Sequence, residues 1–114
     1  MPLVHVLADE IVVPLVRSWG IADLVIVSPD AGGLKRAQRY ASALGAGLAV
    51  IAKARHTAEA AVALQILGEV RERPCLIVDD MASTGRTLTA ATDALLRAGA
   101  RQIHALFVHA VMAP

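Results

Sequence analysis

Residues 76–88, LIVDDMASTGRTL, are the most informative segment of this chain about its fold. It begins with an apolar run and ends that run in two adjacent carboxylates, Asp79 and Asp80. Hydroxyl-bearing residues and a glycine follow, and then a new apolar pattern begins. This succession is typical of a strand that leads through a polar loop into a helix in an α/β protein.

Four short apolar runs carry hardly any charge, and they cover residues 24–28, 48–52, 75–79 and 104–108. Strands with this composition are buried on both faces, as in a parallel sheet covered by helices. Two segments between the runs have apolar residues at helical spacing followed by glycine: Leu34, Ala37, Ala41 and Leu44 before Gly45, and Leu88, Ala91, Leu95 and Ala98 before Gly99. We therefore predict a three-layer α/β/α fold with a mainly parallel sheet.

Right-handed crossovers give the four predicted strands the core order 2-1-3-4. The opening segment, residues 4–18, is predicted to be a helix interrupted or kinked at Pro14 and ending near Ser18 to Gly20. Residues 61–67 are predicted to form a further strand, because apolar residues alternate there, and a mobile loop is expected before it.

Length and composition indicate a single domain spanning residues 1–114, since the chain is 56% hydrophobic. The formal net charge of +1 argues against a surface that binds nucleic acid or an anionic membrane. The sequence holds one cysteine, and neither a signal peptide nor a membrane anchor is recognisable in it. We therefore expect a soluble, cytoplasmic protein without a nucleic-acid or membrane partner.

The loop that follows the third predicted strand combines two kinds of chemistry. Its hydroxyl groups, its glycine and the N–H groups of the next helix form an anion site, for which the candidates are Ser83, Thr84, Gly85 and Thr87. The carboxylates of Asp79 and Asp80 can accept hydrogen bonds from a vicinal diol or hold a hydrated Mg²⁺. Diol and phosphate together indicate a sugar phosphate. The alternative is a helix cap beside a solvated acidic pair.

A second polar loop, SPDAGGLKR at residues 28–36, follows the first predicted strand. Gly32 and Gly33 permit close approach of a ligand, Asp30 is a candidate metal ligand, and Lys35 and Arg36 lie one turn into the helix. Both loops fall at the switch point, where open parallel sheets bind ligands. A glycine pair alone is a weak signal.

Two cations, Lys53 and Arg55, follow the second predicted strand at the same edge of the sheet. Beside a mobile loop they could clamp developing polyphosphate charge, although solvated cations are the simpler interpretation. The four histidines have no metal-ligand spacing, and only His109 is expected near the ligand edge.

Residues 75–88, CLIVDDMASTGRTL, resemble the 5-phosphoribosyl-1-diphosphate (PRPP) fingerprint of the type I phosphoribosyltransferase fold. Within that fold, residues 25–55 resemble the ribose-phosphate diphosphokinases, or PRPP synthetases. The resemblance begins near residue 4, continues to the end of the chain, and is to the second domain of that family.

The resemblance implies a role for each matched residue. Asp30, Ala31, Gly32 and Gly33 would form the diphosphate loop, with Asp30 linked to Mg²⁺. Lys53 and Arg55 would be catalytic and would stabilise the transferred diphosphoryl group. Asp79 and Asp80 would bind the ribose hydroxyls, and Ser83, Thr84, Gly85, Arg86 and Thr87 would bind the 5-phosphate. The implied reaction transfers diphosphate from MgATP to ribose 5-phosphate, which gives PRPP and AMP.

The sequence also departs from the family pattern, since Ser83 replaces an acid and Arg86 replaces a glycine. Arg86 therefore fits only if its backbone need not be left-handed. Family synthetases have a second homologous domain that supplies ATP contacts, so we expect activity only if a partner or a missing domain completes the ATP site.

Three alternatives stay open. The chain could be a small type I phosphoribosyltransferase that uses PRPP, a non-catalytic PRPP-binding regulatory or assembly subunit, or one piece of a longer protein. An exposed sheet edge and the family resemblance both favour a homo-oligomer or a partner subunit.

Overall fold

The computed structural model describes residues 4–54, 63–80 and 85–109. Helices and strands alternate along most of the chain. The elements are β1 (Val4–Ala8), α1 (Asp9–Ser18), β2 (Val25–Ser28), the 3₁₀ turn η1 (Ala31–Gly33), α2 (Leu34–Leu44), β3 (Gly47–Ala54), β4 (Ala63–Leu67), β5 (Pro74–Asp80), α3 (Gly85–Arg97) and β6 (Gln102–His109).

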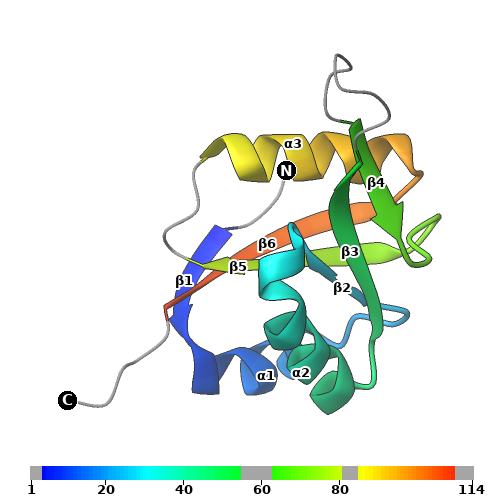
Figure 1. Cartoon of the computed structure of the whole chain (residues 1–114). Coiled ribbons are helices and arrows are strands. Elements are labelled where there is room, and N and C mark those ends of the chain that lie inside the picture. Colours follow the sequence, from blue (N-terminus) through cyan, green and yellow to red (C-terminus); the bar gives the residue numbers. More distant parts are fainter. Residues whose placement is uncertain (1–3, 55–62, 81–84, 110–114) are drawn as a thin grey trace.

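The strands form one six-stranded sheet in the order β1-β6-β5-β2-β3-β4. All neighbouring strands are parallel except β3 and β4, which are antiparallel. Helices α1 and α2 lie on one face of the sheet, and α3 lies on the other (Figure 1). The predicted three layers are confirmed. The predicted core order 2-1-3-4 is confirmed too, since β3, β2, β5 and β6 are the four predicted strands.

The core consists of two apolar layers, one on each face of the sheet. Strand β5 contributes to both, because successive side chains of a strand point to opposite faces. Leu76 and Val78 pack with residues of α1 and α2, whereas Cys75 and Ile77 pack with Ala91 and Leu95 of α3. The apolar run at residues 75–78 is therefore what this position in the sheet requires.

The predicted helix over residues 4–18 is only partly right. Residues Val4–Ala8 form β1, which pairs in parallel with β6 at the sheet edge. The prediction missed this strand because the pattern of an isolated run of five residues is compatible with either a helix or a strand. Pairing with β6 makes it a strand. Helix α1 ends at Ser18 as predicted, and it continues through Pro14 rather than being interrupted there.

The predicted strand at 61–67 is confirmed as β4, Ala63–Leu67. Most of the loop expected before it lies outside the described residues. Helix α2 ends at the predicted glycine, since Gly45 has the left-handed conformation at φ 63°. Among the described residues, no helix has the length and apolar character needed to cross a membrane.

Candidate functional site at the carboxyl edge of the sheet

The loops after β2 and β5 meet at one edge of the sheet. Strands β2 and β5 are parallel neighbours with Val27 beside Ile77, so both end at this edge. A pocket of about 520 Å³ lies here. Its lining residues come from both loops and from α2: Asp30, Gly32, Gly33, Arg36, Arg39, Asp79 and Asp80. The structure therefore brings together most of the predicted diphosphate loop and the predicted diol-binding acids.

The first loop is held by its own hydrogen bonds. The side chain of Asp30 accepts a hydrogen bond from the backbone N–H of Gly33 at 3.1 Å, which caps η1. The hydroxyl of Ser28, a fully buried residue, donates to the backbone carbonyl of Asp30. A Cβ added at Gly33 would lie 3.1 Å from Ser28 Oγ, so the loop is close-packed where the backbone borders the pocket.

The acidic pair is divided between two environments. Asp79 is buried, with 8% of its surface exposed. Its Oδ1 accepts a hydrogen bond from the backbone N–H of Asp80 at 2.8 Å. Asp80 is exposed. Since neighbouring residues of a strand face opposite sides, Asp80 lies on the α2 side of the sheet, and this makes it the acid better placed for a ligand in the pocket.

The predicted 5-phosphate segment is described only in part. Ser83 and Thr84 lie outside the described residues. Gly85, Arg86 and Thr87 form the first turn of α3, which begins after the carboxyl end of β5. The backbone of Arg86 belongs to the right-handed helix α3. An arginine can therefore stand where the family pattern has glycine, because no left-handed conformation is needed here. The first N–H groups of a helix attract anions, and α3 presents them at the predicted edge.

Lys53 does not line the described part of the pocket. It is exposed near the end of β3, three residues beyond Val50, which pairs with the last residue of β2. Three residues of strand span roughly 10 Å, so Lys53 projects past the edge where the pocket lies. Arg55 lies outside the described residues. The catalytic role of both cations stays a prediction.

The carboxylates that line the pocket fit a hydrated magnesium ion. No group of three or more metal-ligating side chains occurs within the described ranges. Mg²⁺ needs no such cluster, because it keeps several waters and binds through one or two carboxylates together with phosphate oxygens. A carboxylate has enough lone pairs for Asp30 to accept the Gly33 hydrogen bond and still bind a metal.

Two arginines of the pocket were not predicted as site residues. The sequence marks Arg36 only as a cation after the glycine pair, and no motif singles out Arg39. They lie three residues apart on α2 and so share one helix face. Their spacing from Gly33 was a signal that sequence analysis could have used.

The side-chain surroundings of one histidine, His104, are described. The ring of His104 lies 6.1 Å from the ring of Trp19, centroid to centroid, beside the layer formed with α1 and α2. His109 ends β6 one residue beyond Val108, the partner of Asp80, so its backbone lies at the predicted ligand edge.

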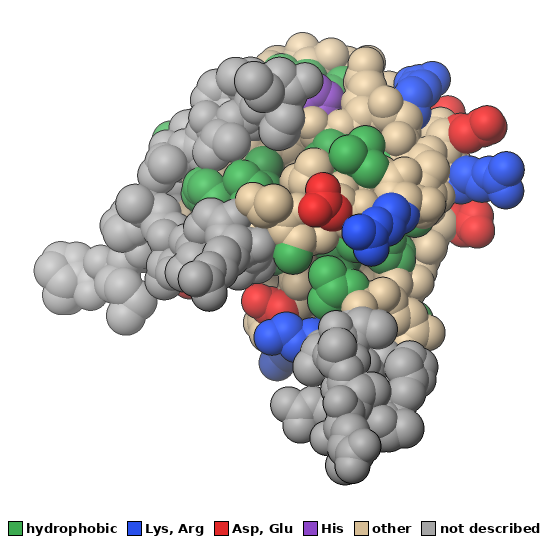
Figure 2. Space-filling model, turned by 90° about the horizontal axis from the view of Figure 1, so that it is seen from above, with side chains coloured by type: hydrophobic (Ala, Val, Ile, Leu, Met, Phe, Trp, Pro, Cys, Tyr) green, Lys and Arg blue, Asp and Glu red, His purple; other side chains and the backbone are tan. Residues whose placement is uncertain are grey.

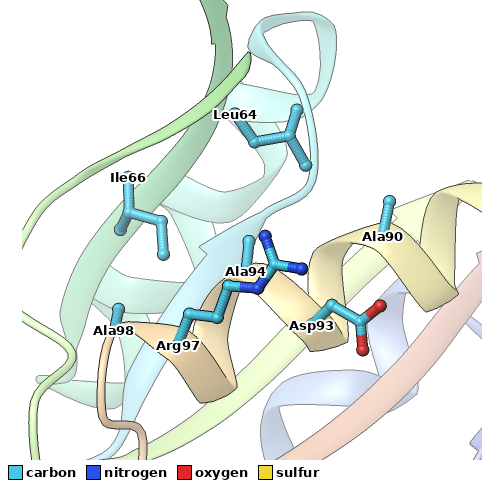
Figure 3. A pocket seen from close by; sticks show the side chains of 7 residues that line it. All are labelled: Leu64, Ile66, Ala90, Asp93, Ala94, Arg97 and Ala98. Atoms are coloured by element: carbon cyan, nitrogen blue, oxygen red, sulfur yellow. The ribbon is translucent and has the colours of Figure 1, made fainter. Parts of the chain in front are cut away.

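A second pocket of about 590 Å³ lies between β4 and α3. Leu64 and Ile66 of β4 face the helix across it, and the other lining residues lie on α3: Ala90, Asp93, Ala94, Arg97 and Ala98 (Figure 3). Seen from above, the described surface on the α3 side carries acidic and basic side chains interspersed with apolar ones (Figure 2). This pocket is slightly larger than the first, but it holds none of the predicted site residues.

The sheet topology and the two loops at its carboxyl edge are of the phosphoribosyltransferase type. Comparison with known proteins supports this assignment. Residues 3–114 match the phosphoribosyl transferase domain family. The chain belongs to this family.

Ribose-phosphate pyrophosphokinases are among the relatives in sequence. The chain is 41% identical over 111 residues to a ribose-phosphate pyrophosphokinase of Chromobacterium violaceum. The aligned region covers 97% of this chain and 34% of that relative. The chain is 38% identical over 115 residues to the ribose-phosphate pyrophosphokinase of a Nostoc species. The chain thus spans about a third of the length of the curated relatives it matches.

Solved structures show the same fold. The phosphoribosylpyrophosphate synthetase of Mycobacterium smegmatis superimposes with a TM-score of 0.76 at 28% identity, over 93% of this chain and 34% of that one. The purine phosphoribosyltransferase of Pyrococcus horikoshii superimposes with a TM-score of 0.68 at 22% identity, over 90% of this chain and 79% of that one. The resemblance to a PRPP synthetase domain is therefore confirmed.

Proposed function

We propose that this chain binds ribose 5-phosphate or PRPP together with Mg²⁺ at the carboxyl edge of the sheet. The observation that carries the proposal is the pocket in which Asp30, Gly32 and Gly33 of one loop lie with Asp79 and Asp80 of the other. One loop suits a diphosphate and the other a ribose diol, and PRPP contains both groups.

We also propose that the chain takes part in diphosphoryl transfer from ATP to ribose 5-phosphate, with the ATP site completed by a partner or by another part of the protein. The identity of its relatives as ribose-phosphate pyrophosphokinases supports this, although the chain spans only about a third of each. Bound Mg²⁺ would neutralise charge on the diphosphate. Asp80 would orient the ribose hydroxyls, and Lys53 and Arg55 would approach the transferred group from the end of β3.

The test is calorimetric titration of the chain with ribose 5-phosphate and with PRPP, each in the presence of MgCl₂. Binding of either compound is expected, and no binding at millimolar concentration would refute the assignment. Asp80→Asn should weaken binding of the sugar phosphate. The matched control is Asp23→Asn, because Asp23 is an exposed acid that precedes β2, at the opposite edge of the sheet.

A second experiment tests the reaction. The chain is incubated with ribose 5-phosphate and MgATP, and phosphorus NMR follows the formation of PRPP and AMP. Turnover would exclude a non-catalytic regulatory subunit, and binding without turnover would support an incomplete ATP site. Consumption of PRPP with a free purine or pyrimidine base would instead support a phosphoribosyltransferase.

A further inference from the structure

We propose that two copies of this chain associate by antiparallel pairing of their β4 strands, across a two-fold axis at Gln65. The surface consists of the free edge of β4 and the groove between β4 and α3. The inference does not depend on the proposed ligand site, which lies at the ends of β2 and β5.

Strand β4 lies at the edge of the sheet and lacks the features that usually keep such strands apart. It ends the strand order and pairs with β3 through five consecutive residues, in a register without a bulge. Its sequence, ALQIL, contains neither a charged residue nor proline. Alternate residues of an edge strand direct N–H and C=O groups away from the sheet, and charge, proline or a bulge normally discourages a further strand there. Strand β4 can therefore accept another strand.

Apolar side chains are exposed on both faces of β4. Leu64 is 40% exposed and Leu67 is 49% exposed. The two lie on opposite faces, since they are three residues apart in a strand. Leu64 lines the groove of about 590 Å³ next to α3. A strand added at this edge would cover apolar surface on both faces of the sheet.

Pairing of β4 with its own copy satisfies two-fold symmetry. Gln65 is the middle residue of β4, so an axis at Gln65 places Leu64 of one copy opposite Ile66 of the other. Both side chains lie on the α3 face of the sheet. Directly opposed apolar side chains of antiparallel strands stabilise the pairing. Leu64 and Ile66 of both copies would then form one apolar surface between the two α3 helices.

The charges beside the groove also suit a second copy. The charged lining residues are one acid and one cation, Asp93 and Arg97 of α3. Leu64 lies toward the N-terminal end of α3 and Ile66 toward its Ala98 end (Figure 3). The axis that exchanges Leu64 with Ile66 therefore reverses α3 as well, and it places Asp93 of one copy across from Arg97 of the other. A strongly charged partner would find no excess of opposite charge among these residues, whereas a second copy finds a complementary arrangement.

The experiment measures the mass of the full chain in solution by sedimentation equilibrium over a range of concentrations. The unchanged chain is compared with Leu64→Lys and Leu96→Lys. Leu96→Lys is the matched control, because Leu96 is 58% exposed on α3 and does not line the groove. Urea denaturation of each variant checks that the fold is kept.

The unchanged chain is expected to be a dimer that dissociates on dilution. Leu64→Lys should raise the Kd of the dimer by about tenfold or more, because it places a cation against an apolar side chain in two symmetric contacts. Leu96→Lys should dissociate like the unchanged chain. A chain that stays monomeric up to about 1 mM would overturn the inference. So would a Leu64→Lys variant that folds and dimerises as tightly as the unchanged chain.

A second measurement tests the register and does not rely on the lysine variants. Gln65→Cys places two thiols opposite each other across the axis, at a Cα separation that a disulfide can span. Oxidised glutathione should link this variant into a covalent dimer, whereas Gln38→Cys, at an exposed position on α2, should stay unlinked. The native Cys75 is buried and should not compete. Equal cross-linking of the two variants would overturn the inference, since the copies would then not meet at β4.

Discussion

Asp30 caps its own loop by accepting a hydrogen bond from the backbone N–H of Gly33 at 3.1 Å. The loop shape is therefore set by the chain itself, before any ligand arrives. A binding loop that is already ordered loses less conformational freedom when it binds. The contribution of this hydrogen bond to the free energy of unfolding can be measured without a ligand.

Replacing Asp30 with Ala should lower the free energy of unfolding by about 1 kcal/mol, as the loss of a capping side chain does. Asp30→Asn should change it by only a few tenths of a kcal/mol, because an amide oxygen can still accept the Gly33 hydrogen bond. Urea denaturation measures both. Equal stability of Asp30→Ala and the unchanged chain would mean that this hydrogen bond contributes nothing.

The two adjacent acids should respond differently to substitution. Asp79→Ala removes the acceptor for the Asp80 backbone N–H from a buried position, and it should lower the free energy of unfolding by about 1–3 kcal/mol. Asp80→Asn should weaken ribose 5-phosphate binding and leave the fold intact. Denaturation and calorimetry on both variants check this division. It would be wrong if Asp80→Asn were the less stable of the two.

Among the glycines whose surroundings the structure describes, Gly68 is the one at which an added methyl group meets most resistance. Its φ is 126°, and a Cβ there would lie 2.6 Å from the carbonyl oxygen of Leu48. Gly68→Ala should therefore lower the free energy of unfolding by about 3 kcal/mol, from backbone strain and steric overlap together.

Gly20→Ala is the control for Gly68→Ala. Gly20 also has a positive φ, 62°, but nothing lies within 4 Å of an added Cβ. Only the backbone strain of a positive φ applies at this position, so the free energy of unfolding should fall by about 1 kcal/mol. Similar losses for the two variants would show that the contact with β3 does not matter.

The thiol of Cys75 should make the stability of the fold depend on pH above 9. Burial raises the pKa of this thiol to about 11 from 9.0, and the nearby Arg73 guanidinium partly opposes the rise. Between these two values the unfolded chain has lost the thiol proton and the folded chain has kept it. Unfolding is therefore favoured as the pH rises, and stability falls.

Between pH 8 and pH 10 this thiol should account for a loss of about 1 kcal/mol in the free energy of unfolding. Cys75→Ala removes the titrating group and serves as the reference, since its stability lacks this contribution to the dependence on pH. Urea denaturation of both chains at the two pH values measures the difference. Parallel pH profiles would mean that the thiol has the same pKa in the folded and unfolded chains.

Much of the fold follows from local patterns in the sequence. Apolar runs such as residues 75–78 indicate strands with both faces covered, and the helical spacing that ends at Gly45 indicates where α2 stops. The two polar loops could be predicted to meet, because the carboxyl ends of neighbouring parallel strands lie at one edge. The strand-to-helix stretch at 76–88 also marked the place of the acids.

Only the tertiary structure decided the rest. Residues 4–8 became a strand because β6 offers a partner, which is a contact between segments about a hundred residues apart that no local pattern reveals. Asp79 is buried and Asp80 is exposed because they lie on opposite faces of the sheet, and only the folded chain shows which face is covered at that point. The pocket contains Arg36 and Arg39 because α2 packs on β2 and β3 and so brings one helix face to the acids at the end of β5. Spacing along the sequence shows only that the two arginines follow Gly33 on one face of a helix.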